Sequence, residues 1–449
     1  MPTVRCFRRA IRDRSGLARG WNVQVPSLRL SCGGNLSLLP LLRQVPVSGT
    51  LDSRRGGDNA VFAEMWQRPF LLLDLSYFLV FSNISLFYLY PIVLEGMGAT
   101  PEAIGWVMGF FSLATVLTRP LMGKLVGSRG ESPVMWMGII VVLLATIGYL
   151  FLESVGLPLF LVRVVHGIGY SAFISGSFSL VATAVSPEKQ GEAYGMVGAA
   201  IMGAGAIAPP VGEILIRHGG VPVLYWTAAA CALCACLAVF LAGVKPPPGS
   251  RGQQGQKVRY VPLLKDLPFL FLMVSTLLFA NCQSTLVNFL ALISTREGVG
   301  SGRFFFVTFF VAIIALLTMG KVMDRFGKRL FLRLAYPLFA LGLLLIPGFI
   351  ASWRFLLPAI LCGAGMGLLF PAHNALAAGY GTREQKPAAM SFFTSVYDTG
   401  FITGAVFSGW IAQVWNLGGL FIVTGSIAVG GLLIVLFSPI RETAMRNPG

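Results

Sequence analysis

The chain has 449 residues, of which 55% are hydrophobic and 12% are charged, and its formal net charge is +16 at pH 7. Soluble domains carry about twice that share of charged residues, so most of this chain's surface must face lipid rather than water. The positive charge does not indicate nucleic-acid binding, because ten of the 34 Lys and Arg lie in residues 1–60 and nearly all the others lie between apolar segments.

Residues 1–64 differ in composition from the rest of the chain. They carry ten Arg and four acidic residues, with scattered Gly, Ser and Pro and no helical period. Their apolar runs are too short for a signal peptide or a membrane span. We expect a disordered basic tail, or sequence upstream of a natural start at Met65. An Arg-rich, acid-poor segment is also typical of an organellar transit peptide.

Twelve apolar segments of about 20 residues follow, the length that a helix needs to cross the hydrocarbon core of a bilayer. They are residues 70–94, 102–123, 133–152, 157–183, 192–216, 221–243, 267–293, 303–322, 330–351, 355–379, 388–413 and 417–438. The sequence therefore predicts an all-α integral membrane protein with two six-helix bundles, residues 65–243 and 267–440. A polar, Pro/Gly-rich linker (244–266) joins them, and residues 441–449 form a tail.

The two predicted bundles are related by an internal repeat. With an offset of 196 residues, Gly167 corresponds to Gly363, and with an offset of 197 residues GKLVGSRG from Gly123 corresponds to GKVMDRFG from Gly320. A repeat of nearly 200 residues built from membrane-length helices is typical of a duplicated transporter.

The basic residues predict the orientation of the chain. If the N-terminus is cytoplasmic, the inner loops and the C-terminus hold eighteen Lys and Arg after residue 118, and the outer loops hold four. This bias predicts that both termini face the cytoplasm.

Several motifs resemble the major facilitator superfamily over residues 69–440. GKVMDRFGKR (Gly320–Arg329) resembles the family's signature for the loop between the second and third helices of each half, and RVVHGIG (Arg163–Gly169) resembles its fourth-helix signature. GAIAPPVG (Gly205–Gly212) resembles the fifth-helix signature of exporters. FFSLATVLTRPLMG (Phe110–Gly123) and SVYDTG (Ser395–Gly400) resemble the arabinose-efflux-permease-like branch of bacterial drug, sugar and metabolite exporters.

The chain departs from these signatures at a few positions. In the N-terminal loop signature, Gly127 and Ser128 replace the usual Asp and Arg, and Glu131 replaces the terminal basic residue. In the fifth-helix signature, Ala208 and Glu213 replace glycines.

The resemblance implies a secondary transporter of the bacterial inner membrane that exports a small organic molecule in exchange for protons, and that acts as a monomer. An importer driven by proton symport shares all these features, and a transport-inactive receptor or a membrane-embedded enzyme are alternatives of another class. We expect no enzyme activity, because the sequence contains no catalytic motif or ATP-binding loop. We expect no cofactor and no metal either, since Cys231, Cys234 and Cys236 lie in an apolar helix without His or acidic partners.

Four ionisable residues within the predicted spans are candidates for proton coupling. A charge in the bilayer costs at least a few kcal/mol, so Arg163 and Asp398 are functional hypotheses by default. Removal from water makes a carboxyl group hold its proton more tightly, which suits Asp398 to proton transfer near neutral pH. By resemblance, Arg163 couples cargo to proton movement. His166 and Asp74 are weaker candidates, and all four can instead serve as hydrogen-bonded or interfacial structural residues.

Polar and aromatic residues in the middle of the first, fourth, seventh, tenth and eleventh predicted helices are candidates for the cargo cavity, since those helices line the cavity in the resembled family. They are Asn83, Tyr170, Asn281, Gln283, Asn288, His373, Asn374 and Tyr397. For each single residue, a hydrogen bond between helices is the simpler explanation.

A third set of residues is expected to act in gating. The acid Asp324 can cap a helix and form ion pairs that hold the cytoplasmic side closed, whereas small residues and prolines let helices approach closely and bend. The set comprises Gly123, Gly320, Asp324, Arg325, Gly327, Arg329, Gly167, Gly169, Gly205, Pro209, Pro210 and Gly212. Static packing and a topology signal from the basic residues are the alternatives.

Overall fold

The computed structural model describes residues 67–186, 189–243, 261–380, 385–438 and 440. It does not describe the side chains at positions 261, 262, 320, 321, 324 and 387. The expected basic tail (1–64), most of the linker, the tail 441–449 and the side chain of Asp324 therefore lie outside the described residues.

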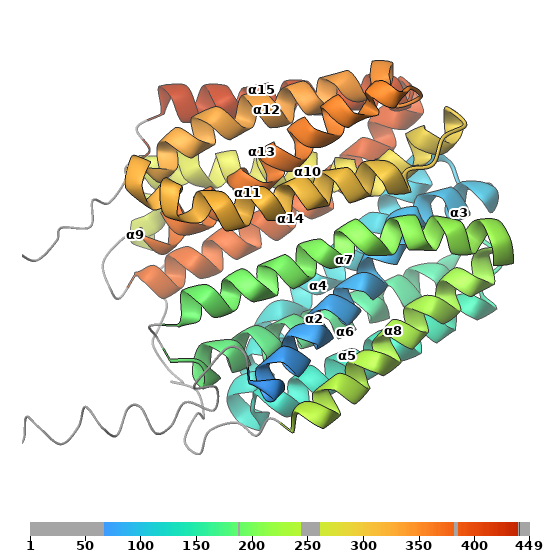
Figure 1. Cartoon of the computed structure of the whole chain (residues 1–449), viewed down its shortest axis with the longest axis horizontal. Coiled ribbons are helices and arrows are strands. Elements are labelled where there is room, and N and C mark those ends of the chain that lie inside the picture. Colours follow the sequence, from blue (N-terminus) through green and yellow to red (C-terminus); the bar gives the residue numbers. More distant parts are fainter. Residues whose placement is uncertain (1–66, 187–188, 244–260, 381–384, 439, 441–449) are drawn as a thin grey trace, which may run out of the picture. The chain divides into compact units, whose positions relative to one another are not determined.

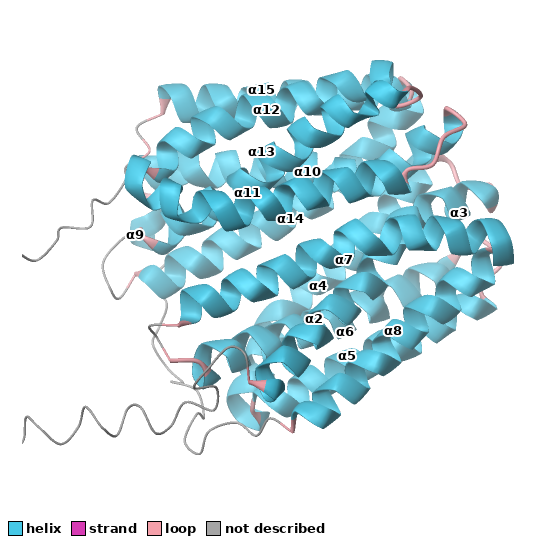
Figure 2. Ribbon diagram, in the orientation of Figure 1, coloured by secondary structure: helices cyan, strands magenta, loops and turns pink. Residues whose placement is uncertain are grey.

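All regular secondary structure in the described part of the chain is helical (Figure 2). The first half comprises α2 (Arg68–Leu86), the 3-10 turn η3 (Phe87–Leu89), α3 (Tyr90–Gly96), α4 (Pro101–Arg129), α5 (Glu131–Gly148), α6 (Leu157–Ala184), α7 (Gln190–Gly219) and α8 (Val221–Ala242). The second half comprises the short α9 (Val261–Leu264), then α10 (Leu267–Arg296), α11 (Gly302–Phe326), α12 (Lys328–Phe349), α13 (Leu356–Ala378), α14 (Lys386–Val414) and α15 (Leu417–Phe437). Two further 3-10 turns, Tyr149–Phe151 and Trp353–Phe355, adjoin α5 and α13.

Each of the twelve expected spans coincides with a helix or a continuous helical path. The first one is interrupted: α2, η3 and α3 follow one another from Arg68 to Gly96, with Pro91 in the first turn of α3. Proline lacks an N–H group and disturbs the regular hydrogen-bond ladder, which accounts for the change of helix type here.

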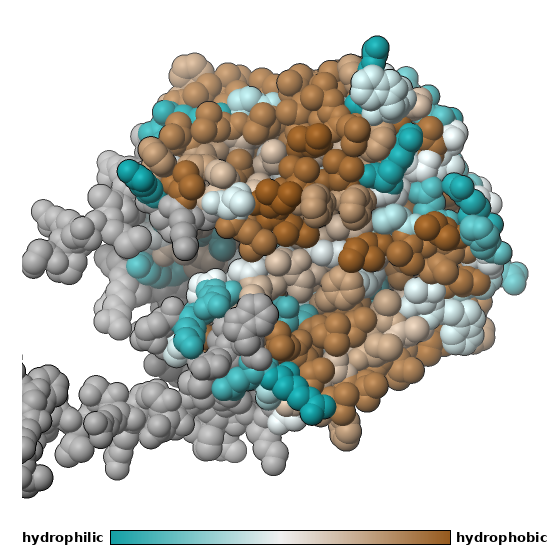
Figure 3. Space-filling view, in the orientation of Figure 1, coloured by the Kyte–Doolittle hydropathy of each residue, from teal (hydrophilic) through white to brown (hydrophobic). Residues whose placement is uncertain are grey.

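Eleven helices of the described chain are long and apolar enough to cross a membrane, judged by length and composition. The eleventh expected span, α14, is not among them although it has 29 residues. Its centre carries Ser395, Tyr397, Asp398 and Thr399, which lower its mean hydropathy. Figure 3 shows the complementary feature, a largely hydrophobic surface over the helices on the visible face of the molecule. Large apolar side chains such as Leu117, which is 69% exposed, are also open to the surroundings. Such a surface fits a lipid environment.

The two halves repeat the same packing. In the first half α2 packs on α7 and α8, α6 packs on α4 and α5, and α5 packs on α8. The second half repeats these contacts: α10 packs on α14 and α15, α13 packs on α11 and α12, and α12 packs on α15. The duplication inferred from the sequence is thus a duplication of helix packing.

The loop motif is also repeated as backbone geometry. Gly130 and Gly327, which correspond in the repeat, each end one helix and begin the next, with φ angles of 90° and 95°. Glycine adopts this left-handed region without a steric penalty, so both copies turn sharply at the same point.

The halves meet along α4 with α14 and along α7 with α11, and α3 also contacts α10 (Figure 1). We call the end of the bundle at which α2 begins and α15 ends the terminal end, and the opposite end the distal end. At the distal part of the α4–α14 contact, a methyl group on Gly105 would lie 2.6 Å from the Ala405 carbonyl oxygen, and one on Gly409 would lie 2.6 Å from the Pro101 carbonyl oxygen. At the terminal end, by contrast, a methyl group on Gly123, Gly191 or Gly195 would meet nothing within 4 Å. The halves are therefore packed tightly at Gly105 and Gly409, whereas Gly123, Gly191 and Gly195 at the terminal end have open space beside them.

Candidate functional site

An ion pair joins the two halves at the α4–α14 contact. Arg119 of α4 lies with one Nη atom against a carboxylate oxygen of Asp398 on α14. Their side chains are 25% and 16% exposed, so the pair is neither sealed in the core nor free in solvent. It lies 18 residues from the distal start of α4 and 12 residues from the terminal start of α14, well inside both helices.

The pair faces the space between the halves and not lipid. Two residues turn a side chain by about 200° around a helix, so Arg119 lies nearly opposite the exposed Leu117. Nine residues make about two and a half turns, so Asp398 lies opposite the exposed Phe407. Because the distal side is tightly packed, the partial exposure of the pair is best explained by access from the terminal end.

Aromatic rings of the first half gather around Tyr170, which lies within electrostatic range of this pair. Tyr170 of α6 interacts electrostatically with both Arg119 and Asp398. Its ring contacts those of Phe81 and Phe111, with centroid separations of 5.6 and 5.5 Å. This side of the interface offers flat apolar surface and one phenol group.

The second half contributes mainly amides and hydroxyls. The Tyr397 hydroxyl donates to Gln283 Oε1 at 2.8 Å, and Asn281 Nδ2 donates to Thr403 Oγ1 at 3.2 Å. Tyr397 directly precedes Asp398, and its ring packs on Phe401 at 5.3 Å. A cargo held here can therefore stack on the rings of the first half and exchange hydrogen bonds with the second half.

Arg163 has a different environment from Arg119. It is 2% exposed and lies inside the first half, with its guanidinium carbon 4.7 Å from the ring centre of Tyr90 and 5.2 Å from that of Phe87. The rings of Phe111 and Tyr149 lie within 6 Å as well. One Nη atom contacts Met108 Sδ at 2.6 Å, and no carboxylate of the described residues pairs with it. Cation–π attraction is the main compensation for burying this charge.

His166 and Asn83 extend this cluster within the first half. His166 Nε2 lies 3.1 Å from Asn83 Oδ1, and Nδ1 lies 3.4 Å from the Tyr149 hydroxyl. Asn83 donates in turn to Thr146 Oγ1 at 3.0 Å and to the Ala228 carbonyl at 2.8 Å. Both side chains are buried and join helices α2, α5, α6 and α8, so the structure places them in the core of the half and not at the interface.

His373 has an analogous place in the second half. Its Nε2 is 2.9 Å from Ser275 Oγ and its Nδ1 is 2.8 Å from the Leu369 carbonyl, while the Tyr336 hydroxyl also bonds to Ser275. The ring is buried and both nitrogens have partners. These contacts connect α10, α12 and α13.

The remaining predicted polar residues are scattered. Asn288 is buried and donates to Ser284 Oγ at 3.1 Å. Asn374 on α13 is partly buried. Asp74, in the second turn of α2, is partly buried, and one of its carboxylate oxygens is buried without a hydrogen-bond partner. The cargo-cavity role of Asn288 and Asn374 and the proton-coupling role of Asp74 stay predictions.

The predicted gating residues occupy several kinds of contact. Gly167 and Gly169 lie against the backbones of α4 and α5, Gly205 lies against the ring of Phe309, and Gly212 lies against Leu86, Leu89 and Leu224. Pro209 and Pro210 are inside α7. Arg325, in the last turn of α11, is exposed, and Arg329, in the first turn of α12, donates to the carbonyl oxygens of Val435 and Ser438 at the end of α15. Gly320 and Asp324 belong to α11, but their side-chain positions are not described.

Sequence reasoning missed Arg119 as a functional residue. It counted Arg119 with the basic residues of the inner loops, at the end of an expected span of 102–123. The structure continues α4 to Arg129, which brings Arg119 ten residues inside the helix. The quoted motif FFSLATVLTRPLMG contained the signal, an arginine within an apolar run. Among the described residues, no three His, Cys, Asp or Glu side chains gather as metal ligands.

Two matching six-helix halves, linked by a charged pair between them, define a membrane transporter built by duplication. Residues 73–307 and 299–449 match the sequence profile of the Major Facilitator Superfamily. The chain therefore belongs to the major facilitator superfamily, a family of transporters and not of enzymes.

Similarities to known transporters support this assignment. The multidrug resistance protein MdtG of Escherichia fergusonii is 24% identical over 390 residues, covering 82% of this chain and 93% of the relative. In fold, the chain is similar to a bacterial homologue of the human lysosomal transporter Spinster in an inward-facing, occupied conformation, with a TM-score of 0.64, 16% identity and coverage of 82% and 95%. It is also similar to the nucleoside transporter NupG, with a TM-score of 0.65, 13% identity and coverage of 82% and 98%. The expected family and its resemblance to drug exporters are confirmed.

Proposed function

We propose that this protein exports a small organic molecule across the bacterial inner membrane in exchange for protons, with the Arg119–Asp398 pair as the coupling site. The observation that carries the proposal is a titratable carboxylate paired with an arginine across the two halves. Alternating access moves these halves against one another, so a charge change at their contact acts directly on that movement.

The coupling follows from the charges of the pair. While Asp398 is ionised, its attraction to Arg119 holds α4 against α14; at a partly buried site two such charges about 4 Å apart attract by about 4 kcal/mol. A proton on Asp398 removes this attraction and leaves Arg119 without a counter-charge. Proton binding therefore loosens the contact between the halves, and release of the proton restores it. Arg119 keeps its charge throughout, because a guanidinium does not lose its proton in proteins.

The surroundings of the pair indicate the class of cargo. Tyr170, Phe81 and Phe111 provide aromatic surface, while Gln283 and Asn281 provide hydrogen-bonding groups. The charges of Arg119 and Asp398 largely compensate one another. These features favour a neutral or weakly charged molecule with an apolar face and a few polar groups.

Export is the direction that the relatives support, since the curated relatives carry the name multidrug resistance protein. The Pro209–Pro210 pair in α7 agrees with the fifth-helix signature of exporters. The fold alone does not set direction, because a nucleoside transporter shares it. Proton symport into the cell is the alternative, and it uses the same pair.

The arrangement in the cell is part of the proposal. The excess of basic residues at the terminal end favours a cytoplasmic location for that end and for both termini. The distal end then faces outward. We propose residues 65–243 and 267–440 as the two moving units and residues 244–266 as a cytoplasmic connection between them.

Metabolite profiling tests this function. The medium and cytosol of cells with the wild-type protein, without it, and with Asp398→Asn would be compared, and Glu153→Gln would serve as a control because Glu153 is exposed in a distal loop. The proposal predicts a compound that leaves the cells only with the wild-type or control protein, with at least a tenfold loss of export for Asp398→Asn. A compound that the wild-type protein instead removes from the medium would contradict export and establish uptake.

A further inference from the structure

The distal contact between α7 and α11 contains an unusual helix cap. The first N–H groups of a helix have no partner within it and are usually bonded by the side chain of the preceding residue. For α11 that residue is Ser301, whose side chain makes no capping hydrogen bond and whose hydroxyl is buried without a partner. Glu213 takes this role from the other half of the protein: its Oε2 accepts a hydrogen bond from the Gly302 N–H at 2.7 Å.

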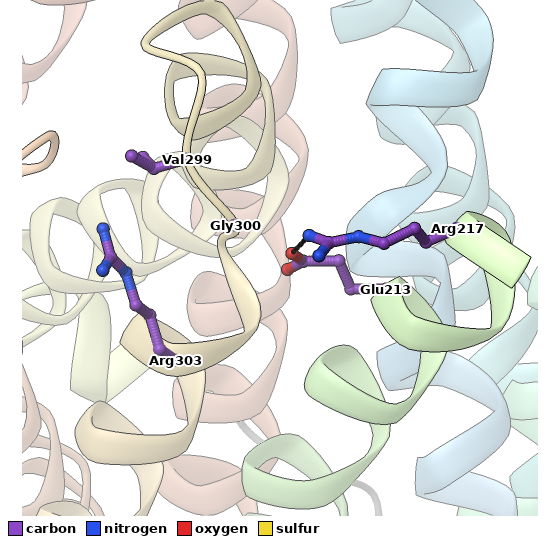
Figure 4. Close-up of a pocket in the computed structure, with 5 residues that line it drawn as sticks. All are labelled: Glu213, Arg217, Val299, Gly300 and Arg303. Atoms are coloured by element: carbon purple, nitrogen blue, oxygen red, sulfur yellow. Dashed lines mark hydrogen bonds and ion pairs between the residues drawn. The ribbon is translucent and has the colours of Figure 1, made fainter.

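Two glycines of the local sequence, Gly300 and Gly302, leave room for this carboxylate and for the close approach of α11 to α7. The loop before α11 passes directly in front of Glu213, whose other oxygen accepts from Arg217 at 3.4 Å (Figure 4). A methyl group on Gly300 would collide with the Glu213 carboxylate. One on Gly302 would lie 2.5 Å from Pro210 Cα. Glycine at position 302 lets the N-terminus of α11 approach the backbone of α7 this closely, and glycine at position 300 leaves room for the Glu213 carboxylate.

The pseudo-equivalent contact in the repeat is built differently. There α4 is capped within its own half, since Thr100 Oγ1 accepts from the Ala103 N–H at 3.3 Å. The residue 196 positions after Glu213 is Gly409, and it packs on the start of α4 without any polar side chain. Both contacts bring a helix N-terminus close to the opposite half, but only the α7–α11 contact uses a charged cap from that half. Glu213 is also one of the positions at which the chain departs from the fifth-helix signature.

We infer that Glu213 is a latch of the distal gate, the contact formed by Glu213, Gly300 and Gly302. When the halves separate at the distal end, α11 loses its cap and the carboxylate loses a charge-assisted hydrogen bond at the positive end of a helix. Closing the gate restores both. The latch therefore biases the protein toward the state that is closed at the distal end and open at the terminal end.

A second contact at the same end has a smaller effect. Arg296 at the end of α10 donates from Nε and Nη2 to Glu95 Oε1 of α3, at 2.9 and 2.7 Å. The side chain of Arg296 is 45% exposed and that of Glu95 is 31% exposed, and ion pairs open to solvent contribute little. Glu213 is the better shielded acid and binds an otherwise unbonded backbone N–H. The latch thus depends on Glu213 more than on Glu95.

This inference is independent of cargo, direction and proton coupling, so its test reads conformation and not transport. Spin labels would be placed at Ser154 and Trp353, exposed distal positions of the two halves, after replacement of the seven native cysteines. A second label pair at Gly191 and Ser395 would report the terminal end. Pulsed electron paramagnetic resonance then gives the distance distribution of each pair.

Glu213→Ala is expected to increase the population with a long distal distance roughly fivefold, the usual effect of removing a cap. The population with a short terminal distance should rise by the same factor. Glu213→Gln keeps an acceptor oxygen without the charge, so its shift should be smaller. Gly302→Ala should open the distal end by a different route, through its collision with Pro210. Glu297→Gln, an exposed acid of the same surface, is the matched control and should leave both distributions unchanged.

Two outcomes would overturn the latch. One is a distal distribution in Glu213→Ala and Glu213→Gln that equals that of the wild type. The other is an equal shift in Glu297→Gln, which would assign the effect to surface charge in general. If Glu213→Ala cannot be purified, the distal distance distributions of Glu213→Gln and Gly302→Ala are compared with that of the wild type. A shift in both supports the latch, and wild-type distributions in both contradict it.

Discussion

Arg119 and Arg163 are both arginines within membrane-spanning helices, but they are stabilised in different ways. Arg119 has a carboxylate partner and partial access to solvent. Arg163 has neither, and aromatic rings surround its guanidinium. A planar, weakly hydrated guanidinium stacks on rings, whereas an ammonium is compact and strongly hydrated. The two positions should therefore respond differently to the same substitution.

We predict that Arg163→Lys destabilises the protein by about 2 kcal/mol, because a desolvated cation–π contact is worth about that much. Arg119→Lys is the control: lysine keeps the charge next to Asp398, so the change in stability should be within about 0.5 kcal/mol. Thermal unfolding of both variants in the same detergent measures the difference. Equal unfolding temperatures for the two variants would mean that the aromatic cluster does not depend on a guanidinium.

At the level of residues, the sequence predicted individual groups better than their partners. Asp398 was predicted as a titratable group in mid-helix, and the structure places it between the halves. Its partner Arg119 lies on another helix, and no local pattern reports such a long-range contact. Similarly, Asn83 was expected to line the cargo cavity and His166 to take part in proton coupling, but their positions in the core depend on tertiary packing.

At the level of elements, helix composition reflects helix position. The helix α14 carries Asp398 and is less apolar than the other spans, while its distal part packs closely on α4 through Gly409. One helix thus combines a polar centre, where the halves exchange charge, with a small-residue contact, where they close. Apolar length predicted twelve helical segments, of which eleven are apolar enough to cross a membrane and α14 is less apolar. It could not predict the break between α2 and α3, because proline is tolerated within some spans and interrupts others.

We predict that Gly409→Ala destabilises the distal contact between α4 and α14, because the added methyl group would lie 2.6 Å from the Pro101 carbonyl oxygen. Overpacking of this kind costs about 1–3 kcal/mol. Gly430→Ala on α15 is the matched control, since a methyl group there meets nothing within 4 Å. Thermal unfolding of the two variants measures the effect. A Gly409→Ala variant as stable as Gly430→Ala would show that the close approach of α4 to α14 is not required.

At the level of the whole molecule, duplication produces two similar halves, and the contacts between them differ in ways that matter for function. The repeated helix contacts form each half, and the α4–α14 and α7–α11 contacts lie between the halves. The α4–α14 contact contains the Arg119–Asp398 pair, and the α7–α11 contact contains the helix cap formed by Glu213. The repeat was evident in the sequence. The departures from symmetry that carry the mechanism became evident from the contacts between the halves.

The most direct test of proton coupling at Asp398 uses the exported compound identified by metabolite profiling, in proteoliposomes with an imposed pH gradient. We predict that Asp398→Asn accumulates at least tenfold less compound when the gradient is imposed, because the asparagine cannot bind and release a proton. The variant should still exchange internal for external compound without a gradient, because the cargo site and the two halves remain. Accumulation at the wild-type level in Asp398→Asn would contradict the assignment of proton coupling to the Arg119–Asp398 pair.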